Sequence, residues 1–297
     1  MSRTPRLSKK FSKPTLSRLI NGDISAPPPS IEELSTRLDH ALVAKYPAYS
    51  RGTIQKLIKD GSITVNGKIT TKANTAVSEE DILGLTPPTV PPPEQKPNLQ
   101  TIFEDDNILV LNKPAGMLSI SKGEYNPEPT IEDYGLLVHR LDRGTSGVII
   151  LAKNPKVQTL LRKQFQDRKA HKTYYAITSG HPNPPHAIID IPLARNLSRP
   201  TTFRPDPSGR EAITEYEITK SGNQYSLVKL HPTTGRTHQL RVHLAHINTP
   251  ILGDTAYGGS PAPRLFLHAA ELEITIPGGT RQTFVSPLPE EFTNALR

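Results

Sequence analysis

The sequence has no cysteine in its 297 residues. This absence excludes disulfide bonds, thiolate zinc sites and cysteine nucleophiles. Long hydrophobic runs are missing as well, since no stretch approaches the roughly 18 apolar residues that a transmembrane helix needs. We therefore expect a soluble protein that has no membrane partner.

Acidic residues are fewer than basic ones, with 28 Asp and Glu against 36 Lys and Arg, and the formal net charge is +8. Such a balance favours a polyanionic partner such as nucleic acid over an acidic protein or a neutral metabolite. No acid precedes Asp23, whereas six basic residues do. We expect residues 1–30 to form a disordered basic arm on a cytoplasmic protein; the alternative is an organelle-targeting segment.

Proline divides the chain, because it is concentrated in two clusters at 27–29 and 87–97. Proline runs cannot donate ladder hydrogen bonds and favour an extended, semi-rigid spacer. The sequence therefore predicts four parts: the arm at 1–30, a small domain at 31–86, a linker at 87–100 and a main body at 101–297. It does not indicate an oligomeric state.

The small domain is predicted to contain helices followed by a β-hairpin. Ser50 is a suitable N-cap for a helix with apolar residues at helical spacing, and Gly61 can end that helix. The pair Asn66-Gly67 between alternating apolar residues is typical of a tight hairpin turn. Basic residues decorate the helices, where they either bind phosphates or form an ordinary solvated surface.

The body contains apolar runs of strand character interrupted by two helical patterns, at 155–165 and 237–245. The pattern shows no regular strand-helix alternation, so we expect an α+β fold around a mixed, mainly antiparallel sheet. The candidate strands begin at Ile108, Val148, Thr173, Ala212, Tyr225 and Leu272.

The segment HRLDRGTSG is the densest polar stretch and directly precedes an apolar run. Its Asp142 lies between Arg140 and Arg143 in the sequence, and nearby positive charge favours an ionised carboxylate. Such a group can act as a nucleophile or as a base. The residue pattern by itself favours an ordinary surface Asp in a salt bridge over a catalytic group.

Four histidines lie close together at 231, 238, 243 and 246. Their spacing does not match a zinc-binding helix, and neither a phosphate loop nor a dinucleotide-binding pattern is present. We therefore expect no metal and no cofactor, and we interpret the histidines as structural or phosphate-contacting.

Five segments of the body occur in order as FEDDNILVLNKPAG, HRLDRGTSGVIILAKN, KTYYAI, GRTHQLRVHLAHINTPILGDTAYGG and RLFLHAAEL. Together they resemble the ribosomal large-subunit (RluA) family of pseudouridine synthases over residues 101–292. The resemblance implies that Asp142 is the catalytic carboxylate and that Arg140 takes the space of the flipped base. It also implies that Tyr174 stacks on the uracil and that Arg241 pairs with the carboxylate.

The small domain carries the run RLDHALVAKYPAYSRGTIQKLIKDGSITVNGKIT. It resembles the RNA-binding domain shared by a small-subunit ribosomal protein, tyrosyl-tRNA synthetases and several RNA-modifying enzymes. This resemblance implies an RNA surface that includes Arg37, Ser50, Arg51, Gln55 and Lys56.

The two resemblances imply an RNA pseudouridine synthase, an isomerase that flips specific uridines out of structured RNA and uses carboxylate catalysis. The expected RNA partner is large-subunit ribosomal RNA. Position 144 is Gly where family members commonly carry an acid, and the interval between KPAG and HRLD is short. The alternatives are a non-catalytic RNA-binding ribosome-assembly factor and, more remotely, a metal-dependent hydrolase.

Overall fold

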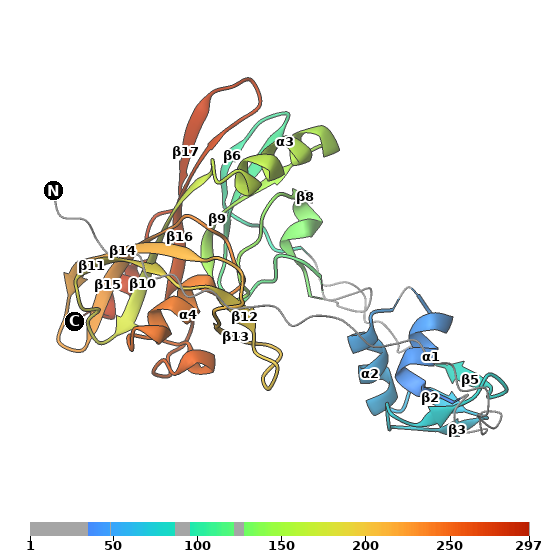
Figure 1. Ribbon diagram of the computed structural model, residues 1–297. Helices are drawn as coiled ribbons and strands as arrows, with labels where there is room; N and C mark the ends of the chain where they lie inside the picture. Colours follow the sequence, from blue (N-terminus) through green and yellow to red (C-terminus); the bar gives the residue numbers. More distant parts are fainter. Residues whose placement is uncertain (1–34, 48, 87–95, 122–127, 297) are drawn as a thin grey trace, which may run out of the picture. The chain divides into compact units, whose positions relative to one another are not determined.

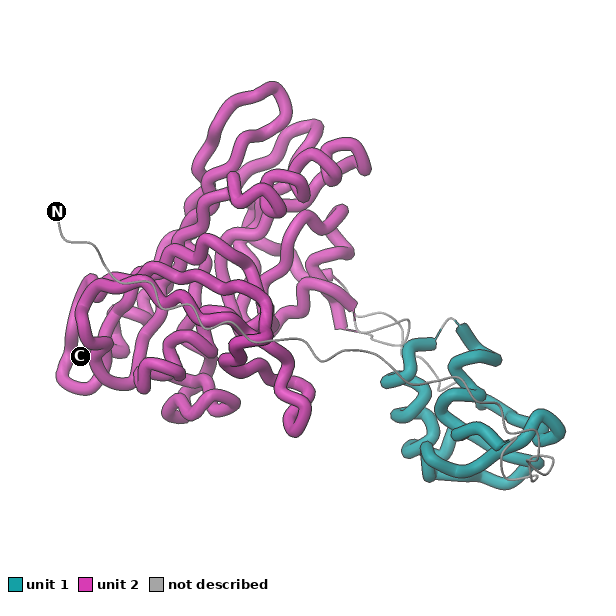
Figure 2. Tube along the Cα trace, in the orientation of Figure 1, with its two compact units in different colours: residues 1–86 teal, residues 87–297 magenta. Residues whose placement is uncertain are grey.

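A computed structural model describes residues 35–47, 49–86, 96–121 and 128–296. The chain divides into two compact units, 1–86 and 87–297 (Figure 2). The predicted basic arm at 1–30 lies outside the described residues, as does most of the predicted linker.

The small unit combines two helices with short antiparallel strands (Figure 1). Strand β2 pairs with both β3 and β5, and β1 pairs with β4. The predicted arrangement of helices followed by a hairpin is confirmed. The elements are β1 (Thr36–Arg37), α1 (Leu38–Lys45), α2 (Arg51–Lys59), β2 (Ile63–Val65), β3 (Lys68–Ile69), β4 (Ala76–Val77) and β5 (Leu83–Leu85).

Local signals explain where these elements begin and end. The Ser50 hydroxyl accepts a hydrogen bond from the backbone N–H of Thr53 at 3.2 Å, which caps α2. Gly61 follows α2 with a φ of +76°, and the hairpin turn has positive φ at Asn66 and Gly67. These dihedrals are the ones that a helix end and a primed turn require.

The body is built on one ten-stranded sheet in the order β11-β14-β15-β10-β16-β9-β7-β6, with β17 beside β16 and β8 beside β9. Among its described strands only β9 and β16 pair in parallel, so the predicted mixed, mainly antiparallel sheet is confirmed. The strands are β6 (Thr101–Glu104), β7 (Ile108–Lys113), β8 (Leu136–Leu137), β9 (Ser146–Ala152), β10 (His171–Ser179), β11 (His186–Asp190), β14 (Ile213–Ser221), β15 (Tyr225–Pro232), β16 (Leu267–Thr275) and β17 (Arg281–Val285).

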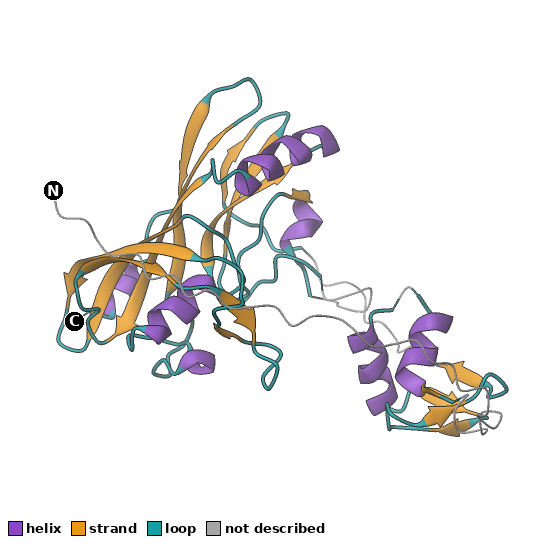
Figure 3. Cartoon of the chain, in the orientation of Figure 1, coloured by secondary structure: helices purple, strands orange, loops and turns teal. Residues whose placement is uncertain are grey.

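Helices and a small ribbon surround this sheet (Figure 3). Asn154 caps α3 by accepting a hydrogen bond from the Val157 N–H at 3.0 Å. The helix predicted from about position 237 begins at Gln239. The preceding residue, His238, has a φ of +57°, which lies outside the range of a right-handed helix. The remaining elements are η2 (Ile131–Tyr134), α3 (Pro155–Gln166), β12 (Leu193–Arg195), β13 (Phe203–Pro205), α4 (Gln239–His246), η3 (Thr255–Tyr257) and α5 (Glu290–Asn294).

Strand β9 is the centre of the core, since every one of its residues is buried. Alternate side chains point to opposite faces: Val148 and Ile150 pack on the side of α3, whereas Ile149 and Leu151 pack on the side of η2. In the parts of the chain that the structure describes, no helix is long and apolar enough to cross a bilayer.

Candidate active site

A cleft of about 400 Å³ opens in the body between the loop preceding β9, the start of α4, strand β10 and the end of β15. Its walls include Arg140, Asp142, Tyr174 and Arg241. The fold thus brings the four body residues singled out from the sequence to one cleft. The lining also contains the cationic side chains Arg168, Lys172 and Arg236.

Two side chains hold the loop that carries Asp142. Ser119 Oγ donates to the Leu141 carbonyl at 2.8 Å and accepts from the Leu141 N–H at 3.1 Å. On the other side, buried Lys113 donates from Nζ to the carbonyls of Arg143 and Thr145, at 3.2 and 2.8 Å. The backbone around Asp142 is therefore restrained on both sides, which orients the carboxylate before any substrate binds.

Lys113 is fully buried at the end of β7. Burial lowers its pKa to about 7, although the negative charge of Asp142 acts in the opposite direction. Its third acceptor is the carbonyl of Pro114 at 2.9 Å. Three carbonyl acceptors compensate the ammonium group for the water it has lost.

The Asp142 loop enters the sheet where β9 approaches β16 most closely. Gly147 has a φ of +114°, and a Cβ added there would lie 2.1 Å from the carbonyl oxygen of Ala269. Glycine alone tolerates both the dihedral and the contact. The entry point of the loop is therefore fixed by backbone packing.

The Asp142 side chain is 21% exposed and lies near two basic groups. Arg241 Nη1 is 3.6 Å from its Oδ2, and His238 Nε2 is 4.0 Å from the same oxygen. The arginines adjacent in sequence bind elsewhere: Arg140 donates to Thr237 Oγ1, and Arg143 donates to the Gly116 carbonyl and pairs with Glu128. Within the described residues, the arginine paired with Asp142 is thus Arg241, from a distant segment of the chain.

Arg241 is itself held by a second carboxylate. Its Nε and Nη2 donate to the two oxygens of buried Asp254, at 2.7 and 2.8 Å, and its guanidinium carbon lies 4.9 Å from the Tyr257 ring centroid. Burial alone would lower the pKa of Arg241, but the contact with Asp254 outweighs it and raises the pKa. The guanidinium group is consequently charged, planar and fixed in orientation.

Tyr174 lies at an irregular point of β10. The register against β16 shifts between Thr173 and Tyr174, and such a bulge redirects the side chain that follows it. The ring is half-buried and packs between two hydrophobic clusters. Burial raises the pKa of Tyr174, and the nearby carboxylate of Asp142 raises it further. The phenol therefore keeps its proton at neutral pH.

The histidines of this region are used in different ways. His139 accepts from the Ile150 N–H at 3.2 Å and stacks on Phe165 with the ring centroids 4.6 Å apart, and burial lowers its pKa to about 3. His243 is buried and bonded to Thr214. Only His238 of the four clustered histidines lines the cleft. In the described parts of the chain, no three His, Asp or Glu side chains converge as a metal site would require.

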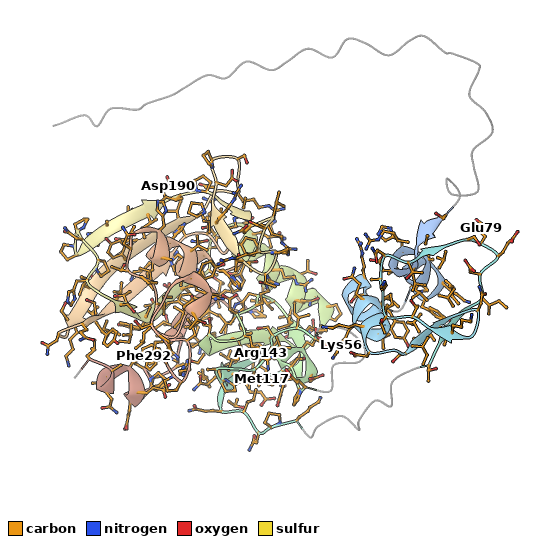
Figure 4. The ribbon with its side chains drawn as sticks, turned by 90° about the horizontal axis from the view of Figure 1, so that it is seen from below. Lys56, Glu79, Met117, Arg143, Asp190 and Phe292 are labelled. Carbon is orange, nitrogen blue, oxygen red and sulfur yellow. The ribbon has the colours of Figure 1, made fainter. Side chains whose placement is uncertain are left out.

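The small unit gathers three of its predicted RNA-binding residues around one carboxylate. Arg37, Arg51 and Gln55 all donate to Asp39, which is fully buried, with distances from 2.7 to 3.3 Å. Arg37 and Arg51 remain 50% and 52% exposed. The exposed side chain of Lys56 extends from α2 away from this core (Figure 4).

Reading the sequence missed several residues that shape the cleft, above all Asp254, Ser119 and Lys113. Asp254 and Lys113 stand in the quoted segments ILGDTAYGG and NKPAG, but no local pattern pairs them with particular partners. A charged residue within an apolar stretch of sequence was the available signal. Such a residue is expected to be buried, and a buried charge needs a partner.

The body thus has a cleft with an ion-paired but accessible carboxylate. Comparisons with known proteins identify the class of protein. A family model described as RNA pseudouridylate synthase matches residues 107–246, and a model of the S4 domain matches residues 36–83. The ribosomal large subunit pseudouridine synthase D of Haemophilus influenzae is 33% identical over 305 residues, which cover 89% of this chain and 91% of the relative.

Solved structures agree with this similarity. Human RNA pseudouridylate synthase domain containing 4 aligns with a TM-score of 0.55 and 28% identity, over 66% of this chain and 91% of the human one. Human RNA pseudouridylate synthase domain containing 1 aligns with a TM-score of 0.57 and 25% identity, over 67% and 95% of the two chains. The protein is therefore an isomerase built on the pseudouridine synthase fold.

The chain belongs to the RNA pseudouridylate synthase family, and an S4 domain lies in its N-terminal unit. The predicted fold class and the predicted enzyme class are confirmed. The alternative of a non-catalytic assembly factor is not favoured by these relatives.

Proposed function

We propose that this enzyme converts uridine to pseudouridine in large-subunit ribosomal RNA, with Asp142 as the catalytic carboxylate. The names of the bacterial relatives support this RNA as substrate, and the net charge of +8 favours a polyanionic partner. The observation that carries the proposal is the position of Asp142. Its carboxylate faces a cleft of about 400 Å³, where Arg241 holds it from one side.

The reaction breaks the bond between ribose C1′ and uracil N1, turns the base, and joins C1′ to C5. The proton of C5 is lost and N1 gains one, so no atom is added or removed overall. Asp142 acts either as a nucleophile on the substrate or as a base toward a ribose proton. Both roles require an ionised oxygen, which the charge of Arg241 stabilises.

The target uridine must leave its stack to reach the carboxylate, at a cost of a few kcal/mol. Tyr174 offers an aromatic face in the cleft wall, and its phenol stays neutral. Arg140 is exposed at the cleft and bonded only to Thr237 among the described side chains. We assign stacking on the uracil to Tyr174 and occupation of the vacated position in the RNA to Arg140.

The S4 domain supplies additional RNA contacts in this proposal. Arg37 and Arg51 present half-exposed guanidinium groups that suit bidentate phosphate binding. Ser50, Gln55 and Lys56 extend the same α2 segment. We place the enzyme in the cytoplasm, where a bacterial ribosome would be assembled, and mapping pseudouridines in RNA from cells with and without the gene identifies the target.

The substitution Asp142→Asn tests the assignment most directly. It keeps the size of the side chain but removes the charge, so we expect product formation to fall by at least about a thousandfold. RNA affinity and folding should remain close to those of the unchanged protein. Asp190→Asn, at an exposed position of β11, is the matched control. Wild-type turnover by D142N would refute the proposal.

A further inference from the structure

His238 has a strained backbone at the edge of the cleft. It precedes α4 with a φ of +57°, a conformation that costs energy for a residue with a Cβ. Its ring stands edge-on to both Phe203 and Tyr257, with each pair of centroids 5.7 Å apart. Packing against these two rings therefore fixes the direction of the His238 ring.

A chain of hydrogen bonds decides which ring nitrogen carries the proton. The Phe203 N–H donates to the Tyr257 hydroxyl oxygen at 2.8 Å, and that hydroxyl lies 2.8 Å from His238 Nδ1. Burial raises the pKa of Tyr257, so its hydroxyl keeps its proton. Since the hydroxyl oxygen already accepts from Phe203, we take the hydroxyl as the donor and Nδ1 as the acceptor. Because Nδ1 accepts this bond, the proton of a neutral ring must lie on Nε2.

The electrostatics of the cleft favour the same tautomer. Nε2 faces Asp142 Oδ2 at 4.0 Å, where an N–H is attracted and a lone pair would be repelled. Burial lowers the pKa of His238, and the positive charges of Arg241 and Arg140 lower it further. The negative charges of Asp142 and Asp254 raise it, but the net shift is downward. The ring is consequently neutral at pH 7.

Arg241 and His238 approach the same carboxylate oxygen. Nη1 of the arginine and Nε2 of the histidine are 3.6 and 4.0 Å from Asp142 Oδ2. For each of these two side chains, the carboxylate oxygen that lies closest is Oδ2. Two donors on one oxygen leave the other free to react, and catalytic hydrogen bonds that are long in a free enzyme shorten when substrate binds.

We propose that His238, held in its Nε2–H tautomer by Tyr257, is a positioning residue that directs Oδ1 of Asp142 toward the substrate. This inference rests on the proposed function, since it assigns His238 an action through Asp142. The tautomer and the direction of the ring are properties of the free enzyme, so they can be measured without any turnover.

The tautomer is tested by ¹⁵N NMR of the full-length protein labelled at histidine. His238 is assigned by the signal that disappears in His238→Gln. At neutral pH we expect a protonated Nε2 and an unprotonated, hydrogen-bonded Nδ1. Tyr257→Phe should relax this preference into a mixture and reduce kcat about tenfold. A proton on Nδ1, or a doubly protonated ring at pH 7, would overturn the inference.

Two substitutions separate a role of Nε2 from a role of the backbone. Glutamine places its amide N–H near the position of Nε2, whereas asparagine reaches only to Nδ1 but tolerates positive φ better. We expect His238→Gln to keep kcat within about tenfold of wild type and His238→Asn to lose about a hundredfold. RNA affinity should be unchanged in both, and circular dichroism verifies that both fold.

The outcomes distinguish this inference from the proposed function. If asparagine restores activity as well as or better than glutamine, the backbone is what matters and His238 does not position the carboxylate. If D142N is inactive while both His238 variants turn over like wild type, only the inference fails. If D142N is active, the proposed function fails, and with it the role assigned to His238.

Discussion

Asp39 of the S4 domain and Asp142 of the body are both carboxylates paired with arginine, yet their surroundings differ. Asp39 is fully buried and accepts hydrogen bonds from Arg37, Arg51 and Gln55. Asp142 is 21% exposed, and its nearest cation is 3.6 Å away. In the body, the role that Asp39 has in the small domain belongs to Asp254, which takes the bidentate bond of Arg241.

The comparison shows how a fold separates a buried, hydrogen-bonded acid from an accessible one. Burial raises the pKa of Asp39, but the hydrogen bonds from Arg37, Gln55 and Arg51 outweigh burial and hold the pKa well below its usual range. Arg37, Arg51 and Gln55 together donate five hydrogen bonds to the two oxygens of Asp39. Asp142 receives positive charge without being saturated by donors, so its oxygens remain available to a substrate.

Replacing Asp254, the carboxylate that holds Arg241, should change the surroundings of Asp142 and have the largest effect on kcat. In Asp254→Asn the arginine loses its charged partner and can turn to bond Asp142 directly, which would saturate the carboxylate. We expect kcat to fall about a hundredfold with little change in RNA affinity, measured in single-turnover assays. Arg241→Lys, which keeps the charge but loses the bidentate geometry, should show a similar loss. A D254N enzyme within twofold of wild type would contradict this account.

The corresponding substitution in the S4 domain should affect stability and not chemistry. Asp39→Asn leaves two arginines facing a neutral amide, and we expect the domain to lose about 2 kcal/mol of unfolding free energy. This is less than a fully buried pair would lose, because both guanidinium groups are half-exposed and screened. Denaturant titration followed by a probe in the small domain measures the change. A fall in kcat at saturating RNA, with an unchanged free energy of unfolding of the small domain, would contradict this prediction.

Acid should affect the two regions over different pH ranges. Burial lowers the pKa of His139 to about 3 from an unfolded value of about 6.5. Between these values the unfolded chain binds the additional proton, so the body loses up to about 1.4 kcal/mol per pH unit as pH falls. Asp39 has a depressed pKa, so its contribution persists until pH falls below the unfolded value of about 3.9.

Stability measurements at pH 7, 6 and 5 test this difference. His139→Gln keeps an acceptor for the Ile150 N–H but cannot titrate, so the acid dependence of the body should become shallower. Some slope should remain, since burial also lowers the pKa of His243 and His268. An unchanged slope in the variant would mean that His139 does not contribute to acid sensitivity.

Elements governed by short-range rules were predictable from the sequence. The Ser50 and Asn154 caps and the Asn66-Gly67 turn are set by neighbours within three residues. Strands β11 and β17 were missed, because edge strands with exposed, polar positions lack the apolar run that marks a buried strand. The helix expected from about residue 237 begins at Gln239, because His238 has a positive φ that its residue type does not indicate.

The candidate site was reached by resemblance more than by physical patterns. The residue pattern around Asp142 favoured an ordinary surface carboxylate, and the catalytic role proposed for it rests on the resemblance. The partner Arg241 also came from the resemblance, whereas Asp254, Ser119 and Tyr257 were not singled out. No local rule pairs a particular acid or hydroxyl with an arginine or histidine many residues away.

The sequence by itself determined where most helices and strands lie, because caps, turns and apolar periodicity act over a few neighbouring residues. Its resemblance to a family, and not these local rules, named Arg140, Asp142, Tyr174 and Arg241. Only the tertiary structure decided that Arg241 faces Asp142, that Asp254 holds Arg241, and that Asp39 is saturated. It also decided the direction of the His238 ring. These features depend on burial and on distances of a few ångströms between groups far apart in the chain, and electrostatic effects change steeply with both.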